Sequence, residues 1–337
     1  MAIPPYPASA NPRPRTTVTI GQAFLEMRSI LTLLFALVTL SACEDDPTGL
    51  VSDARGLIVF SRESSHASSE IWVVRPDGSD ARQLTSNNVW DGQAHWSPDG
   101  RRVVFASERD SNPGWPVRRS EIHVMNADGS DVRKLTNSVD GSSTPRWSPD
   151  GTRIVFSRRD DPRVRVYVMN ADGTDLRPVT PVEGGDFLPD WSPDGNRILY
   201  LSSQPPLYRR LMHVVNVDGT GVQMLGGDAA CDGQVSDARW SPDGTRILYS
   251  CAMLNGQAIF SMKADGTDVV RLSRPDMPGT AVYDWAVAWS PDGRQIAFSS
   301  SRAGNHEVYV MSSTGENPTR VTDEASTDIV SDWNRPR

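Results

Sequence analysis

The sequence predicts an all-β fold built from repeated four-stranded antiparallel sheets, and three observations support this prediction. A phrase of the form Trp-Ser-Pro-Asp-Gly recurs at nearly constant spacing along the chain. Each copy is followed by runs such as VVFASE and IVFSRR, whose β-branched and aromatic residues favour strands. Between these runs, no stretch has the spacing expected of an amphipathic helix.

The tryptophan of this phrase marks the period of the repeat. Successive copies lie 51, 44, 49, 49 and 44 residues apart, and the last copy lacks the Ser-Pro-Asp-Gly turn. The six tryptophans are Trp96, Trp147, Trp191, Trp240, Trp289 and Trp333. A fixed period of this size is typical of repeat architectures rather than of separate domains.

Each repeat predicts four strands. The Ser-Pro-Asp-Gly turn follows the Trp-bearing strand, because Pro presets φ, Asp bonds its own backbone and Gly accepts a positive φ. An alternating run comes next, then a strand ending in a turn such as Asp128-Gly129, and then a short strand ending like QLT or KLT. Four-stranded sheets repeated about a centre form a β-propeller.

The two ends of the repeat region predict how the propeller closes. The unit that starts at Leu57 has no Trp strand ahead of it, and the strand that ends in Trp333 has no unit behind it. Either strand alone would leave an unpaired sheet edge. We therefore expect residues 329–333 to supply the innermost strand of blade 1, which gives a six-bladed β-propeller over residues 56–337.

The repeat resembles a known family. The phrase W-S-P-D-G-x-x-I-x-F, followed by a strand ending V-M-N-A-D-G and another ending L-T, is similar to the PD40 (WD40-like) repeat of the TolB family. The resemblance covers residues 56–337 and implies a β-propeller with a binding role in the bacterial cell envelope. The residues before this region do not resemble the α/β domain of TolB itself, so no direct role in the Tol–Pal system is implied.

The first 55 residues differ from the repeats. Residues 1–26 are rich in Pro and unpatterned, and we expect them to be an upstream extension. Residues 27–42 hold an apolar run too short to span a bilayer. The run ends in Leu-Ser-Ala-Cys43, which resembles the lipobox of bacterial lipoproteins, so residues 27–42 would be a signal peptide and Cys43 the site of lipid attachment. Residues 43–55 would then be a tether; an ordinary signal peptide or a buried apolar segment is the alternative.

Charge and motifs limit the classes of function. The net charge of −8 disfavours nucleic acid and anionic membrane surfaces as partners. The chain has no Gly-x-Ser-x-Gly elbow and no Walker loop, and its five histidines are scattered among the repeats. We therefore expect no catalytic residue, no cofactor and no metal site.

Long, dissimilar connections gather at one end of the predicted propeller, and the opposite end consists of tight turns. Long loops on a rigid scaffold are the usual place for recognition. They carry aromatic residues that the repeat does not require, and we predict that these residues bind a partner: Trp90, Trp115, Phe187, Tyr208, Tyr283 and Trp285. The alternative is that they plug the channel or cover the ends of the blades.

Four carboxylates at the same end each stand five residues before a repeat Trp. They are Asp91, Asp186, Asp284 and Asp328. A ring of carboxylates at a channel mouth could attract a cation or a basic peptide segment. Such residues more often cap local backbone groups, and we favour that interpretation.

Two cysteines, Cys231 and Cys251, fall in the same predicted blade and at the same end. An exported protein meets oxidising conditions, so we predict a disulfide between them. The alternative is a pair of free buried thiols.

Together these features predict a binding scaffold rather than an enzyme. We expect an exported, monomeric, lipid-anchored propeller that faces the periplasm, and we favour the outer membrane over the inner. It would present its long-loop face or channel to a protein or peptide of the envelope. The alternatives are a glycan-binding propeller and an enzyme related to polysaccharide lyases or to prolyl-oligopeptidase-type peptidases, whose propellers the repeat also resembles.

Overall fold

A computed structural model of the protein describes the repeat region as strands joined by turns. The described residues are 56–65, 68–111, 119–160, 163–181, 185–204, 209–225, 234–273 and 281–334. They fall in a unit that spans Ser52–Arg337, separate from the unit Met1–Val51. Across the described ranges, no helix has the length and apolar character needed to cross a membrane.

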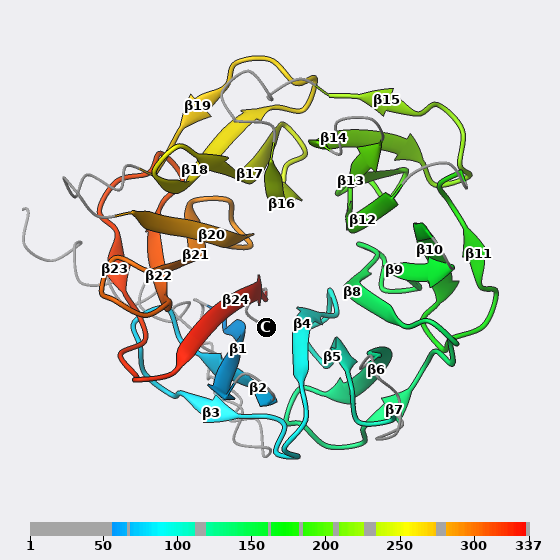
Figure 1. Ribbon diagram of the computed structural model, residues 1–337, viewed down its shortest axis with the longest axis horizontal. Helices are drawn as coiled ribbons and strands as arrows, with labels where there is room; N and C mark the ends of the chain where they lie inside the picture. Colours follow the sequence, from blue (N-terminus) through cyan, green and yellow to red (C-terminus); the bar gives the residue numbers. More distant parts are fainter. Residues whose placement is uncertain are drawn as a thin grey trace, which may run out of the picture. The chain divides into compact units, whose positions relative to one another are not determined.

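The strands form four sheets of four strands and one sheet of eight strands (Figure 1). The first sheet contains β24 (Thr327–Trp333), β1 (Ile58–Ser65), β2 (Ser68–Val74) and β3 (Arg82–Gln83). The second contains β4 (Asp91–Trp96), β5 (Arg102–Ser107), β6 (Glu121–Asn126) and β7 (Arg133–Lys134). The third contains β8 (Ser142–Trp147), β9 (Arg153–Asp160), β10 (Arg163–Asn170) and β11 (Arg177–Pro178). The fourth contains β12 (Gly185–Trp191), β13 (Arg197–Gln204), β14 (Arg209–Asn216) and β15 (Gln223–Met224).

The eight-stranded sheet consists of two antiparallel units. One contains β16 (Val235–Trp240), β17 (Arg246–Met253), β18 (Gly256–Lys263) and β19 (Val270–Arg271). The other contains β20 (Val282–Trp289), β21 (Gln295–Ser300), β22 (Glu307–Ser312) and β23 (Thr319–Arg320). A short parallel pairing of Gly256 with Val282 and of Gln257 with Tyr283 joins the two units. Within the repeat region, Figure 1 shows the units in sequence order around a common centre, with β24, β4, β8, β12, β16 and β20 innermost. The predicted all-β propeller with four-stranded antiparallel blades is confirmed.

The last strand lies in the first sheet. β24 pairs with β1 in antiparallel register from Ile58 opposite Trp333 to Glu63 opposite Thr327. Just beyond this pairing, the Asn334 amide donates to the carbonyl oxygen of Leu57 at 3.0 Å. Residues nearly 280 positions apart in sequence therefore form one continuous ladder, and β1 has no unpaired inner edge.

The Ser-Pro-Asp-Gly turns are held by their own side chains. In the turn after β8, the Thr152 amide donates to Asp150 at 3.0 Å, and the Arg153 amide donates to the Ser148 hydroxyl at 2.9 Å. The Ser148 hydroxyl also donates to Asp150, and this bond holds the pKa of the carboxyl below its usual value. Gly151 has a φ of 69°, which an L side chain rarely adopts. The turn is therefore encoded locally, and it recurs wherever the four residues recur.

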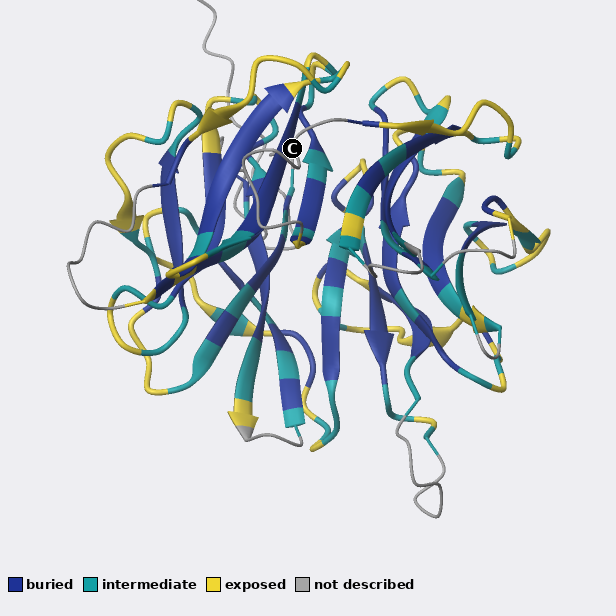
Figure 2. Cartoon of the chain, turned by 45° about the horizontal axis from the view of Figure 1, so that its top comes forward, coloured by how far each residue is buried: buried dark blue, intermediate teal, exposed yellow. Residues whose placement is uncertain are grey.

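The hydrophobic core lies between neighbouring units. Figure 2 shows buried residues along the strands and exposed residues in the turns. One cluster joins Val104 and Ile122 of the second sheet to Trp147 and Phe156 of the third. The other five clusters of the described residues likewise join two neighbouring units, so each unit is stabilised by its neighbours.

Replacing Gly129 by alanine should lower the free energy of unfolding by about 3 kcal/mol. Gly129 has a φ of 89°, and a Cβ at this position would collide with the carbonyl oxygen of Leu84 in the preceding sheet. The control is Gly195→Ala, where φ is 70° and the nearest atom to a Cβ would be 3.9 Å away, so only the strain of a left-handed backbone, about 1 kcal/mol, is expected. Urea unfolding of both variants measures the difference; equal losses would show that the contact between sheets adds nothing.

Candidate functional site at the centre of the propeller

A β-bulge interrupts the inner strands shortly before their repeat tryptophans. The register of β4 with β5 shifts between Gly92 and His95, and corresponding shifts interrupt the other innermost strands. Four residues in these bulges have a left-handed backbone although none is Gly: Gln93, Thr144, Leu188 and Ala286, with φ between 51° and 54°. A bulge adds one residue and increases the local twist, so it changes the direction of the side chains that follow.

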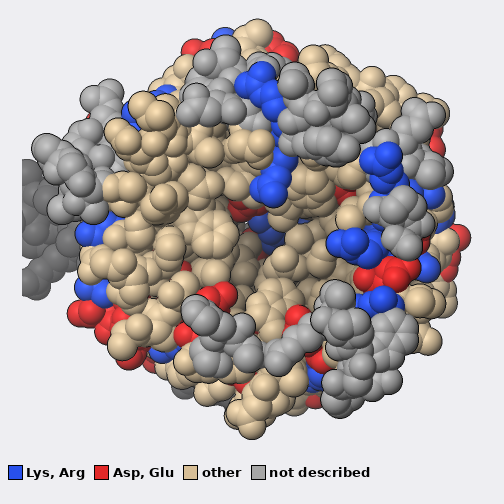
Figure 3. All heavy atoms as spheres, in the orientation of Figure 1, with Lys and Arg blue, Asp and Glu red and all other residues tan. Residues whose placement is uncertain are grey.

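As a result, residues that directly precede the repeat Trp line a common cavity. Its volume is about 210 Å³, and the repeat tryptophans, with Ser and Pro residues of the turns and Asn334, form the rest of its wall. The lining residues that directly precede a repeat Trp are His95, Asp190, Arg239, Ala288 and Asp332. With Arg146, which precedes Trp147, we call these six residues the axial ring. Figure 3 shows the hollow at the centre of the propeller, with acidic and basic side chains inside it.

Three axial-ring side chains accept hydrogen bonds from the backbone of a neighbouring unit. The Trp96 amide donates to Asp332 Oδ2 at 2.9 Å, and the Trp240 amide donates to Asp190 Oδ2 at 2.9 Å. The Trp147 amide donates to His95 Nδ1 at 3.3 Å. Each bond joins the inner strands of two neighbouring units.

Arg146 carries the most deeply buried positive charge of the axial ring. It is only 4% exposed; its Nη1 donates to the Ser331 carbonyl oxygen at 3.1 Å, while its Nε has no hydrogen-bond partner among the described residues. Two buried carboxylates, Asp190 and Asp237, interact with its charge. Asp237 also accepts from the Val287 amide at 3.1 Å and from Arg239.

Burial controls the protonation of these groups. It raises the pKa of Asp190 and of Asp237 to about 7 in each case, although the charge of Arg146 acts in the opposite direction. Burial lowers the pKa of His95 to about 4, although Asp332 opposes this shift. His95 is therefore neutral at pH 7, and since its Nδ1 accepts a hydrogen bond, its proton lies on Nε2, 3.4 Å from Asp332. The charge of the central site thus changes near neutral pH through its carboxyl groups.

The histidines and carboxylates of the described residues do not gather into a group suited to a metal ion. Across the described part of the chain, no three His, Cys, Asp or Glu side chains lie close enough together to hold one. His123 and His213 instead pack against Phe105 and Tyr200, with ring centroids 5.7 Å and 5.5 Å apart.

Four of the six predicted partner-binding aromatic residues lie in the described part. Tyr283 is 44% exposed. The other three are partly buried: Trp90 packs on the cluster that contains Trp147, Phe187 lies under Arg210 at 5.4 Å, and Trp285 meets His306 edge-on at 5.8 Å. Trp115 and Tyr208 lie outside the described residues.

The four predicted channel-mouth carboxylates are buried, and three of them form ion pairs with Arg. Asp91 pairs with Arg109 at 2.8 Å and Asp284 with Arg302 at 3.0 Å, and both carboxylates are fully buried. Asp186 is 2% exposed, and burial raises its pKa although the hydroxyls of Ser202 and Thr180 act in the opposite direction. This placement favours the interpretation that these carboxylates satisfy local groups.

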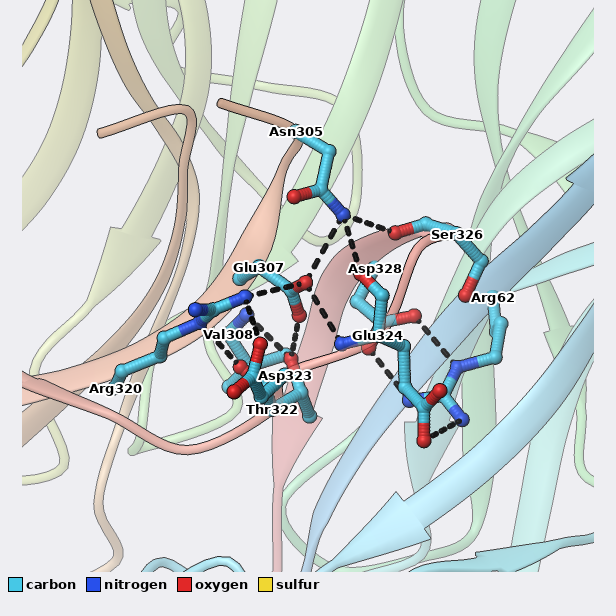
Figure 4. A network of polar contacts seen from close by, with 10 residues as sticks. All are labelled: Arg62, Asn305, Glu307, Val308, Arg320, Thr322, Asp323, Glu324, Ser326 and Asp328. Atoms are coloured by element: carbon cyan, nitrogen blue, oxygen red, sulfur yellow. Dashed lines mark hydrogen bonds and ion pairs between the residues drawn. The ribbon is translucent and has the colours of Figure 1, made fainter. Parts of the chain in front are cut away.

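Asp328 belongs to a larger polar network where β24 meets β1 (Figure 4). Arg62 donates to its two oxygens at 2.8 Å and 2.7 Å. Beside it, Asn305 donates to Glu307 at 2.9 Å and to the carbonyl oxygen of Ser326 at 2.6 Å. The network therefore links β22, β1 and the segment that enters β24.

The cysteine predictions are only partly within the described residues. Cys251 is fully buried and disulfide-bonded. Its predicted partner Cys231 lies outside the described residues, as does Cys43, so the pairing and the lipid attachment stay predictions.

Sequence reasoning missed the axial ring, although a signal was present. The residues before the six repeat tryptophans read His, Arg, Asp, Arg, Ala and Asp. Five of these six are ionisable, although they belong to innermost strands, where an apolar side chain is expected. A bulge without Gly has no comparable signature in the sequence.

Antiparallel four-stranded units around a hollow centre define the class of the protein: its described part is a β-propeller. The family model named TolB beta propeller domain, PD40, matches residues 117–281. Residues 117–281 therefore carry the TolB-like PD40 propeller repeat.

The chain matches only part of the length of two curated relatives. The chain is 30% identical over 96 residues to the uncharacterized peptidase YuxL of Bacillus subtilis, which covers 28% of this chain and 14% of that protein. It is 33% identical over 108 residues to protein Atu1656 of Agrobacterium fabrum, covering 31% of this chain and 36% of that protein. The structure of TolB from Acinetobacter baumannii superposes with a TM-score of 0.66 at 15% identity, over 86% of this chain and 69% of that one, which shows a shared fold.

Proposed function

We propose that this protein is a non-enzymatic binding scaffold of the bacterial envelope that holds a protein or peptide partner at the central channel and the long-loop face. Its body would be a six-bladed ring sealed by β24, exported and anchored through a lipid on Cys43. The TolB-like repeat supports a protein-binding role in the envelope. The observation that carries the proposal is the axial ring, where charged groups line an open cavity instead of an apolar core.

The chemistry of this cavity suits a polypeptide segment. A peptide main chain presents both N–H donors and carbonyl acceptors, and the wall offers both kinds of partner through Arg239, Asp190 and Asp332. The tryptophans of the cavity wall add apolar contact area for the bound peptide, at little cost in side-chain rotamer entropy. Tyr283, 44% exposed and paired through its backbone with Gln257, would extend the contact at the long-loop face.

The test is affinity capture of envelope proteins by the purified chain. We expect the wild type to retain a specific partner, and Tyr283→Ala or Asp190→Asn to lose most of it. Val222→Ala, which removes an exposed side chain in the turn region before β15, is the matched control and should retain the partner. Intact mass of the chain purified from its own membrane reports acylation at Cys43. The proposal fails if no protein is retained above background, or if retention is the same in all variants.

A further inference from the structure

An arginine covers the repeat tryptophan at three successive junctions between units. The guanidinium of Arg102 lies over Trp147 at 4.6 Å from the ring centroid. Arg153 covers Trp191 at 4.9 Å, and Arg197 covers Trp240 at 5.1 Å. Each arginine opens the second strand of one unit, and each tryptophan ends the inner strand of the next. The contact is a cation–π interaction that fills the groove between the two units.

The next junction, between β16–β19 and β20–β23, breaks this pattern. Arg246 holds the equivalent position, but no Lys or Arg of the described chain lies over the Trp289 ring. The Arg246 side chain instead donates to Ser261 Oγ at 3.0 Å and to Asp268 Oδ2 at 3.0 Å. It also donates to the carbonyl oxygen of Asp268 at 3.1 Å. The guanidinium is therefore held away from the tryptophan by three hydrogen bonds.

The sequence explains why this arginine differs. Ser261 lies in β18, opposite Leu248 of β17. The equivalent residue of the other five units is always valine: Val73, Val124, Val168, Val214 and Val310. A valine offers no hydrogen-bond acceptor, so the arginine of those units gains nothing by turning toward it. Ser261 provides the acceptor for the Arg246 Nε, and this hydrogen bond directs the side chain away from Trp289.

The displaced arginine leaves a cavity of about 930 Å³ at this junction. Its wall includes the uncovered Trp289, the apolar side chain of Leu272 and the amide of Gln295. Two carboxylates, Asp243 and Asp292, lie in the same wall, and Arg246 is its one positively charged residue among those described. Arg246 already forms an ion pair with Asp268, so its charge does not offset the two carboxylates. The wall is therefore net negative, with an exposed aromatic face where its sister junctions hold a guanidinium.

We propose that this groove binds an arginine side chain of a partner polypeptide, whose guanidinium stacks on Trp289 and takes the place that Arg246 has left. The charge of the wall favours a cation, and the three sister junctions show that the geometry between units accepts a guanidinium over the tryptophan ring. The site goes beyond the proposed function, because it lies in the groove between two units and not in the central cavity, with which it shares Trp289 and residues of the adjoining turns.

The experiment is an NMR titration of the full chain with the blocked tripeptide Ac-Gly-Arg-Gly-NH2, with Ac-Gly-Glu-Gly-NH2 as the control probe. We expect saturable binding of the arginine peptide alone. Ser261→Val should weaken it about 5- to 30-fold, because Arg246 loses its acceptor and returns to Trp289. Trp289→Ala should weaken it to a similar extent. Tyr167→Ala, which removes a buried aromatic side chain between the second and third units and lines neither cavity, controls for loss of packing and should leave the affinity unchanged.

Equal binding of the two peptides would overturn the proposal, and so would an affinity that Ser261→Val leaves unchanged. A Tyr167→Ala variant that weakens binding as much as Trp289→Ala would also overturn it, because the effect would then be one of folding. Ser261→Val separates this test from the capture experiment, because Ser261 lines only the groove, whereas Trp289 lines the groove and the central cavity. Neither Tyr283 nor Asp190 lines this groove.

Discussion

Replacing Arg62 by alanine should lower the free energy of unfolding by about 3–5 kcal/mol. Asp328 is fully buried, and both of its oxygens accept hydrogen bonds from Arg62. The variant would leave a buried carboxylate without its cation, and removing one partner of a buried ion pair costs far more than removing an exposed one. The loss falls where β1 pairs with β24, so we expect the last strand to detach first. Urea unfolding measures the free energy, and hydrogen exchange of the β24 amides locates the loss.

Two further variants make this result specific. Arg133→Ala breaks a pair with Asp131 that is more than half exposed, and it should cost less than about 1 kcal/mol. The double variant Arg62→Ala with Asp328→Ala should recover part of the loss, because no uncompensated charge remains. The Arg62 guanidinium also lies 4.6 Å from the centroid of the Trp72 ring. The double variant does not recover the stability that this contact contributes. A loss of less than 1 kcal/mol for Arg62→Ala would contradict the role assigned to the pair.

Replacing Asp190 by asparagine should make the protein more stable than the wild type at pH 8 but not at pH 4. The folded-state pKa of Asp190 is about 7, above its ordinary value of 3.8, so between these values the folded protein holds the proton more tightly than the unfolded chain. The contribution of this group to stability is therefore greatest at low pH and falls by about 4 kcal/mol as the pH rises from 4 to 7. Asparagine keeps the acceptor for the Trp240 amide and cannot ionise. The difference in unfolding free energy between variant and wild type should thus grow by about that amount between pH 4 and pH 8.

The pH dependence of the wild type itself contains an opposing contribution. The pKa of His95 is lowered to about 4, so this group adds stability as the pH rises from 4 to its ordinary pKa of 6.5. The comparison of variant with wild type removes that contribution. Asp172→Asn is the control: Asp172 lies in an exposed turn, and the Thr174 hydroxyl lowers its pKa, so its effect should be constant between pH 5 and pH 8. A constant difference for Asp190→Asn over the same range would show that burial does not raise its pKa.

Features set by neighbouring residues could be predicted from the sequence. Ser148, Asp150 and Gly151 make the turn after β8 from their own atoms, and the same residues predict the same turn in every copy. The counts of strands and tryptophans predicted a tail strand that completes the first sheet, and β24 pairs with β1. The placement of candidate site residues was harder to predict. The sequence placed Asp91 and Asp328 near one end of the propeller, but their burial against Arg109 and Arg62 depends on cross-strand and loop contacts.

By itself, the sequence determined the repeat, the turns and the antiparallel four-stranded blade, because each depends on residues only a few positions apart. Only the tertiary structure decided which side chains face the centre and which groove stays open. In the bulge of β4 the left-handed residue is Gln93, not a glycine, and His95 beyond it lines the central cavity. One serine, at position 261, accepts a hydrogen bond from an arginine that the repeat would place on Trp289. The physical reason is that these features depend on pairing register and on contacts between units about 50 residues apart, and a local pattern does not record them.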